Sequence, residues 1–423
     1  MSINYVDEQK TNNSMIVNIY ESKYFIRLNK FITWAILLFM PLSTYTIYTD
    51  KITYGDVLIF IGFLMIIINI IKNNLNLSKI ISSPLLLYGI LIIIHSLILW
   101  MFKPYELSEG LLAVLRYLLY LFMPIIGARY FFDYQYAYKI YKKLAIVFAL
   151  YCIAQFVSYK CFSVVLPSNL FGLPTVDYVS QITSEYNVSM YLSGNVMYRP
   201  RSLFLEPSYF AIYQIPILYL ILNNTSEKNS HKYGIGLLIT LSMFLAGTTT
   251  GIILLVLCWW KPIVTELKKA SLKFVAFQMI LIPGIIYAIN SDYMHSVLRR
   301  IISSDGSLGS SLVGRIINYP AVFQSDLTWY QILFGRGMWT DIGYLPSWGS
   351  IIVSFGLIGL MVFLGVLLRT YCKAQKRGRS MILLVVIMYI GTNTLFNISS
   401  VLMFFLIYSD CENIEKTSGS STH

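Results

Sequence analysis

Two arginines and a glutamate lie close together in the segment 199–209, which reads Arg-Pro-Arg-Ser-Leu-Phe-Leu-Glu-Pro-Ser-Tyr. Arg199 and Arg201 carry permanently charged guanidinium groups whose planar donors suit phosphate oxygens. Glu206 is of the type that accepts a proton from a hydroxyl group. The arginines suit the binding of phosphate groups, and the glutamate is a candidate for proton transfer.

Further arginines extend this set of candidates: they are Arg116, Arg300, Arg315 and Arg336, with Arg299 beside Arg300. Anchoring to lipid phosphates is the alternative for the arginines of the loops, because arginine side chains readily reach a membrane surface. Arg116 differs, since it falls about a turn and a half inside an apolar stretch. A charge at that depth must reach the interface or be paired.

Glu206 also has a purely structural interpretation. Pro207 suits the first position of a helix, and a carboxylate just before that position complements the helix dipole. Capping alone therefore explains the Glu-Pro-Ser sequence, and both interpretations of Glu206 stay open at this point.

The composition indicates that the segments that position these residues lie in a lipid bilayer. Of 423 residues 57% are hydrophobic and 12% are charged, and the mean hydropathy is +0.64. Apolar stretches of about 20 residues recur, and each is long enough to cross a hydrocarbon core of roughly 30 Å. The net charge of +12 is spread over short loops, which argues against a nucleic-acid partner. Acidic residues and cysteines show no metal-type clustering, so we expect neither a metal nor another cofactor.

Membrane spans are predicted at 31–48, 52–71, 82–102, 111–131, 143–166, 204–222, 274–290 and 347–368. Glycine, threonine and asparagine residues interrupt two further apolar stretches, 233–260 and 381–408. We predict a short hairpin in each, with one long helix as the alternative for the first. The fold class is an all-α integral membrane protein with about 12 membrane helices and two large outer, periplasmic loops, 167–203 and 291–346.

Positive residues fix the predicted orientation. A cytoplasmic segment 1–30, a polytopic membrane domain 31–408 and a cytoplasmic tail 409–423 place most lysines and arginines inside. The arginines that remain outside all fall in the two long loops. Orientation alone would remove charge from those loops, so a local function favours arginine there.

Several of these residues resemble a motif of the O-antigen polymerase (Wzy-type) family. The motif has an arginine, two residues, a glycine, and then a phenylalanine and Glu-Pro-Ser at the start of a helix. Arg199, Phe204 and Glu206 occupy the corresponding positions. Ser202 stands where glycine is usual, which leaves open whether Arg199 or Arg201 carries the family's role.

The second loop continues the resemblance. Arg315 precedes an amphipathic stretch, and Gly335-Arg336-Gly337 matches a Gly-x-Gly element of the family. The related O-antigen ligases usually carry a histidine beyond that element. No histidine lies between Gly337 and Leu368, which favours a polymerase over a ligase.

The resemblance implies a metal-independent glycosyltransferase of the bacterial inner membrane, in lipopolysaccharide biosynthesis. It would transfer a growing undecaprenyl-pyrophosphate-linked glycan onto a new lipid-linked repeat unit at the periplasmic face. It assigns catalysis to Glu206, Arg199 and Arg315, and binding of pyrophosphate or glycan to Arg201, Arg300, Arg336 and Arg116. Implied partners are lipid-linked oligosaccharides and membrane lipids, and a chain-length regulator is left open.

Two alternatives remain. One is an O-antigen ligase or another lipid-linked glycan transferase, and the other is a flippase or transporter of lipid-linked sugars. Transporters often contain two related halves. The sequence shows no such internal repeat, and its unequal outer loops favour surface chemistry.

Overall fold

The computed structural model describes residues 23–48, 52–73, 84–102, 107–169, 173–176, 191, 198–224, 227–268, 295, 328–337, 345–392 and 399–418. Its helices are α2 (Lys23–Leu42), α3 (Tyr54–Lys72), α5 (Pro84–Phe102), α6 (Leu107–Tyr130), α7 (Tyr134–Phe162), α10 (Pro207–Asn223), α11 (Asn229–Ala246), α12 (Thr249–Lys268), α16 (Trp329–Phe334), α17 (Ser347–Lys373), α18 (Lys376–Gly391) and α19 (Ser399–Ser418). Two short strands, β1 (Thr46–Tyr48) and β2 (Ile52–Thr53), pair antiparallel between α2 and α3.

The helices have the length and composition of membrane spans. Among the described residues, four helices are long and apolar enough to cross a bilayer: Tyr24–Leu42, Tyr54–Lys72, Tyr134–Phe162 and Ser347–Lys373. Shorter apolar helices accompany them. Many apolar side chains on their outer surfaces stay exposed, such as Ile68 at 59% and Met101 at 81%, as expected of surfaces that lipid covers. The chain is therefore a helical membrane protein, and the number of about 12 spans stays a prediction.

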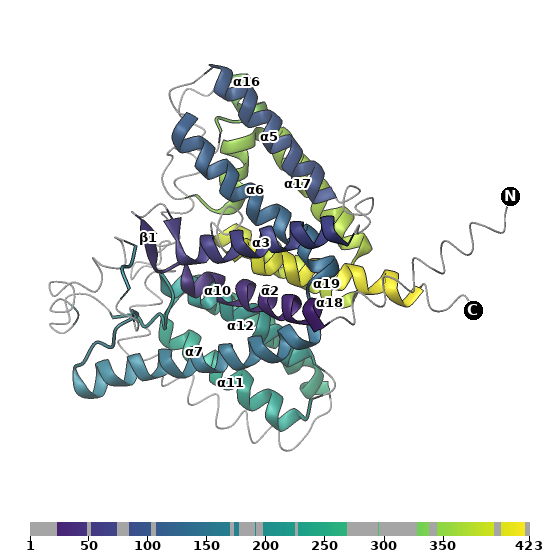
Figure 1. Ribbon diagram of the computed structural model, residues 1–423. Coiled ribbons are helices and arrows are strands. Elements are labelled where there is room, and N and C mark those ends of the chain that lie inside the picture. Colours follow the sequence, from purple (N-terminus) through teal and green to yellow (C-terminus); the bar gives the residue numbers. More distant parts are fainter. Residues whose placement is uncertain are drawn as a thin grey trace, which may run out of the picture.

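The helices form two groups joined by a central layer (Figure 1). On one side α5, α6 and α17 pack together, with α16 against α17, and on the other side α7, α10, α11 and α12 do so. Between them lie α2, α3 and α19, and α19 packs closely along α6. A single large hydrophobic core runs through both groups.

Two helices begin earlier than the sequence predicts. α2 begins at Lys23, within the segment 1–30 that was predicted to precede the first span, and α7 begins at Tyr134 instead of near 143. Charged residues in these first turns lower the local hydropathy, but they share the turns with residues that pack. Phe25 and Leu28 are buried while Arg27 stays exposed, so the helix extends beyond its apolar stretch.

Positively charged side chains gather at one end of the molecule. At this end, which we call the basic end, Lys142 forms an ion pair of 2.7 Å with Glu227. Arg377 lies over the ring of Tyr134 at 4.4 Å, and Lys30 lies beside Tyr136. Positive residues of α2, α7 and α18 thus lie close together at this end.

Glu227 is the carboxylate that holds the basic end together. Burial acts to raise its pKa, but hydrogen bonds from Lys142 and Tyr138 outweigh burial and lower the pKa below the usual value of 4.5. A carboxyl group with a lowered pKa stabilises the fold at neutral pH. That contribution is lost as the pH falls through the lowered pKa.

The first predicted hairpin is present. α11 ends at Gly247, which has a left-handed φ of 59°, and α12 begins two residues later. Trp259 of α12 packs beside Tyr233 and donates a hydrogen bond to Thr240, both in α11, so the chain reverses at this glycine. The arms, 18 and 20 residues long, are not short as predicted. At the second predicted hairpin, α18 and α19 pack together on either side of the interruption.

A second break interrupts α17 itself. Gly356 has φ 67° and ψ −170°, so the helix is divided inside its apolar stretch. The carbonyl groups of Val353 and Ser354 accept hydrogen bonds of 2.7 and 3.0 Å from the backbone N–H groups of Arg336 and Gly337. The Gly-x-Gly element therefore satisfies backbone groups that the break frees, as apolar surroundings require.

Close backbone contact at the break explains why glycine is needed there. A Cβ atom on Gly356 would lie 2.1 Å from the carbonyl oxygen of Leu333, whereas one on Gly365 in the same helix meets nothing within 4 Å. We therefore expect Gly356→Ala to lower the free energy of unfolding by more than about 3 kcal/mol.

Gly365→Ala is the matched control, and its effect should stay within about 1 kcal/mol, in the stabilising direction. Thermal unfolding of the purified variants in detergent measures both. Equal midpoints for Gly356→Ala and the unsubstituted chain would contradict a required break at this residue.

Candidate active site

The end of the molecule opposite the basic end is built around the turn between α2 and α3, and we call it the turn end. Residues 44–46 form backbone hydrogen bonds with residues 174–176 of the first long loop. The Thr44 hydroxyl also donates to the carbonyl oxygen of Leu203 at 3.2 Å. These contacts hold residues 174–176 and 203 of the predicted outer loop 167–203 against the turn between α2 and α3.

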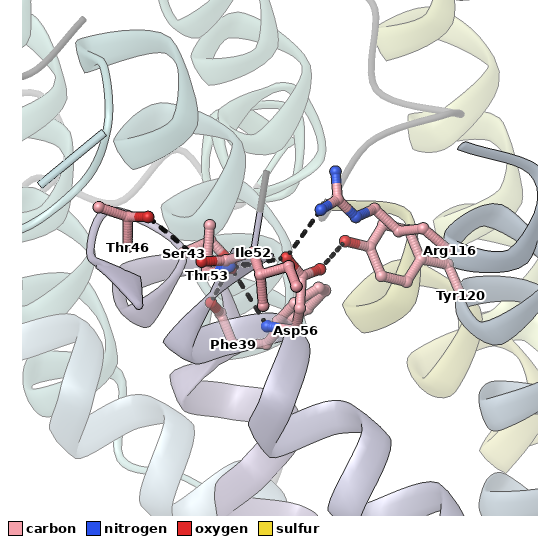
Figure 2. A network of polar contacts seen from close by, with 8 residues as sticks. All are labelled: Phe39, Ser43, Thr46, Ile52, Thr53, Asp56, Arg116 and Tyr120. Carbon is pink, nitrogen blue, oxygen red and sulfur yellow. Dashed lines mark hydrogen bonds and ion pairs between the residues drawn. The ribbon is translucent and has the colours of Figure 1, made fainter. Parts of the chain in front are cut away.

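An ion pair between α3 and α6 lies at this end (Figure 2). A guanidinium nitrogen of Arg116 lies 3.1 Å from Oδ2 of Asp56. The other carboxylate oxygen accepts a 2.6 Å hydrogen bond from Tyr120, one helical turn after Arg116. Asp56 also forms a capping box with Thr53 at the start of α3. Arg116 therefore has the partner that a charge at its predicted depth requires.

The arginine-bearing turn before α10 is held by Gln155 of α7. The side-chain oxygen of Gln155 accepts hydrogen bonds from the backbone N–H groups of Arg201 at 3.2 Å and Ser202 at 2.8 Å. Its amide nitrogen donates to the Ser202 carbonyl oxygen at 3.2 Å, and the carbonyl oxygen of Pro167 and the Ser168 hydroxyl lie at 3.5 and 3.4 Å. Gln155 is fully buried, so these contacts are shielded from water.

Arg201 itself belongs to the interior of the site. Its side chain donates from Nε to the Ser168 hydroxyl and from Nη1 to the carbonyl oxygen of Leu205, both at 2.9 Å, and the residue is 5% exposed. Arg199 is only half-buried. Burial raises the pKa of the nearby Tyr191 phenol, while the charges of Arg201 and Arg199 act to lower that pKa. Of the two arginines, Arg199 is the more accessible to a ligand.

Ser202 occupies the position where the resemblance predicts glycine, and its backbone conformation is one that favours glycine. It has a left-handed φ of 55° and is fully buried. Glycine adopts this conformation without steric cost, whereas other residues do not. Ser202 therefore adopts a backbone conformation that glycine favours.

Glu206 occupies the position just before α10, yet its side chain does not cap the helix. Its carboxylate makes no hydrogen bond to the first backbone N–H groups of α10. Instead the Ser208 hydroxyl donates to Oε2 at 2.8 Å, and the residue is half-buried. Pro207 takes the first helical position, as predicted. The Glu206 carboxylate therefore lies beside the start of α10 and is hydrogen-bonded to the Ser208 hydroxyl.

The two parts of the turn end approach each other through tyrosines. Tyr209, which follows Ser208, lies within electrostatic range of Tyr120, the partner of Asp56. Segments from α3, α6, α7 and α10 therefore contribute to one region that contains arginines, two carboxylates and hydroxyl groups.

Other predicted site residues are placed elsewhere or are not described. Arg336 belongs to the connection between α16 and α17, where His95 of α5 forms a hydrogen bond to the carbonyl oxygen of Phe334. This second region is formed by α5, α16 and α17. Arg300 and Arg315 lie outside the described residues, as does the predicted span 274–290.

Two residues of the site were not singled out from the sequence. Asp56 follows Thr53 with the spacing of a capping box, Thr-x-x-Asp, so this signal was available. Gln155 is a lone amide in an apolar helix. It gives only the general signal of a polar residue that must find a partner inside a membrane protein.

No family model matches the chain, and no curated protein matches it. The class of protein is therefore defined by its own structure: a helical membrane protein with an arginine- and carboxylate-bearing region at one end of its helices.

The left-handed turn gives a test of this region. Ser202→Gly should raise the free energy of unfolding by about 1 kcal/mol, because glycine fits the left-handed φ. It also removes a buried hydroxyl that has no hydrogen-bond partner among the described residues.

Ser163 is the matched control, since it has nearly the same φ, 54°, but an exposed side chain. Ser163→Gly should stabilise less than Ser202→Gly in thermal unfolding of the purified proteins. Destabilisation by Ser202→Gly would contradict this description of the turn.

Proposed function

We propose that this protein is a surface-polysaccharide polymerase of the O-antigen type, located in a bacterial inner membrane with its turn end facing the periplasm. Its substrates would be undecaprenyl-pyrophosphate-linked oligosaccharides. The observation that carries the proposal is the Arg199–Glu206 segment. There an accessible arginine and a carboxylate that does not cap its helix are held in one turn at the end of the molecule away from the basic end.

In the proposed reaction, the bond between the anomeric carbon of the growing glycan and its pyrophosphate breaks. A bond forms between that carbon and a hydroxyl oxygen of the incoming lipid-linked unit. Undecaprenyl pyrophosphate leaves with the electron pair, and the hydroxyl proton passes to the Glu206 carboxylate. Arg199, with Arg315 from the second loop, stabilises the charge that develops on pyrophosphate.

Arg116 and Arg201 take different parts in this proposal. Arg201 is buried and donates to protein oxygens, so it supports the turn from within. Arg116 is paired with Asp56, yet its side chain keeps 35% of its surface exposed, and it can add a second contact to a phosphate oxygen. Arg336 and Arg300 would contact glycan or pyrophosphate from the second loop.

Transport of a lipid-linked sugar is the second candidate, and one observation favours it. Discontinuous helices are typical of the binding sites of secondary transporters, and α17 is divided at Gly356. The backbone groups of Val353 and Ser354 at this break already bind the Gly-x-Gly element, however. The region that carries the catalytic residue types lies on α10 and α7, so we favour the transferase.

A strain of the source bacterium that lacks the protein separates these functions. A polymerase deletion should leave surface glycan with one repeat unit per lipid core. Loss of a ligase or a flippase leaves the core alone. Full-length glycan in the deletion strain would overturn the proposal.

Substitutions of Glu206 test its proposed role as the proton acceptor. Glu206→Gln and Glu206→Asn should lower polymer formation on the order of a hundredfold or more, because a neutral amide takes up no proton at neutral pH. Glu206→Asp should retain part of the activity. Glycan chain length on gels and immunoblots of membrane protein, in the complemented deletion strain, measure these effects.

Asparagine is itself a good helix cap, so Glu206→Asn also tests the structural alternative. Wild-type chain lengths in this variant would remove Glu206 from the mechanism.

A further inference from the structure

Gln155 both accepts and donates hydrogen bonds to the backbone of the turn before α10. Its oxygen is identified by its partners, since two backbone N–H groups point at it and can only donate. Its amide nitrogen returns a hydrogen bond to the carbonyl oxygen of the same Ser202. The backbone N–H and the carbonyl oxygen of Ser202 are thus both hydrogen-bonded to one side chain.

The turn so held lies between the two proposed functional residues. The turn spans residues 201–204, so Arg199 lies two residues before it and Glu206 two residues after it. Within the turn, the N–H of Phe204 donates to the Arg201 carbonyl oxygen, and the Phe204 ring is fully buried. The Arg201 side chain reaches forward to Leu205, next to Glu206. Displacing the turn would therefore move both Arg199 and Glu206.

We propose that Gln155 is a positioning residue that sets the Arg199–Glu206 segment for glycosyl transfer by holding the left-handed turn at Ser202. The inference rests on the proposed function for its effect on polymer. Its structural part, the fixed turn, is independent of that function. Gln155 does not contact substrate, because it is buried beneath the segment that it holds.

Gln214 provides the comparison that isolates this role. It is also a fully buried glutamine at the contact between α7 and α10, and it donates a 3.0 Å hydrogen bond to the carbonyl oxygen of Ala145. Replacing either glutamine by methionine keeps the length of the side chain and removes its hydrogen bonds. Only Gln155→Met acts on the turn.

Hydrogen exchange in the purified full-length protein tests the structural part. Gln155→Met should speed exchange in a peptide covering 199–206 by at least about tenfold, because the Arg201 and Ser202 amides lose their acceptor. Gln155→Glu keeps an acceptor oxygen and should retain most of the protection. Gln214→Met should leave exchange in this peptide unchanged. Unchanged exchange in Gln155→Met would overturn the proposal.

Polymer formation in the complemented deletion strain tests the functional part. Gln155→Met should lower it at least about tenfold at equal protein abundance. Adding this substitution to Glu206→Gln should cause a smaller further loss than in the unsubstituted chain, because the contribution of Glu206 can be lost only once. Independent, multiplied losses, or an equal loss in Gln214→Met, would overturn the positioning role. If Gln155→Met speeds exchange but the unsubstituted chain makes no polymer, the proposed function is overturned. The fixed turn is then still supported.

Discussion

Buried backbone N–H and C=O groups that are not bonded within a helix need another hydrogen-bond partner. This requirement determines the structure at the turns, breaks and ends of the helices. Between α7 and α10, Gln155 binds the turn at Ser202. At the break of α17, the element around Arg336 supplies the missing donors. At the start of α3, Thr53 and Asp56 cap each other. At α3 the partners are close in sequence. In the other two cases the partner comes from a segment that is distant in the chain.

The same requirement explains where the charges are. A charge removed from water needs a countercharge or several hydrogen bonds, so Arg116 pairs with Asp56, and Arg201 donates to protein oxygens. Arg199 and Glu206 lie at the edge of these networks and are half-buried. A rigid interior thus supports an accessible pair, which is the arrangement that catalysis by positioning requires.

The sequence predicted the class of fold, the break at Gly247 and the helix start at Pro207, because apolar length, glycine and proline carry strong local signals. It misplaced the starts of α2 and α7, where charged residues share a turn with packed aromatic residues. It gave only a general signal for Gln155 and none for the break at Gly356, since both depend on contacts between segments far apart in the chain.

The site was predicted in part, for the same reason. The local motif around Glu206 was visible, whereas the pairing of Arg116 with Asp56 and the burial of Arg201 depend on tertiary structure. The sequence left open whether Arg199 or Arg201 corresponds to the arginine of the motif. Burial distinguishes them, because only the first keeps a side chain that a ligand can reach.

The central claim is that the protein itself joins lipid-linked units. Lipid-linked repeat units extracted from the deletion strain, supplied to the purified protein in liposomes, test it most directly. We expect longer lipid-linked glycans, with one undecaprenyl pyrophosphate released for each bond formed. Repeat units that cross the bilayer without growing in length would contradict the proposed reaction and show a transporter instead.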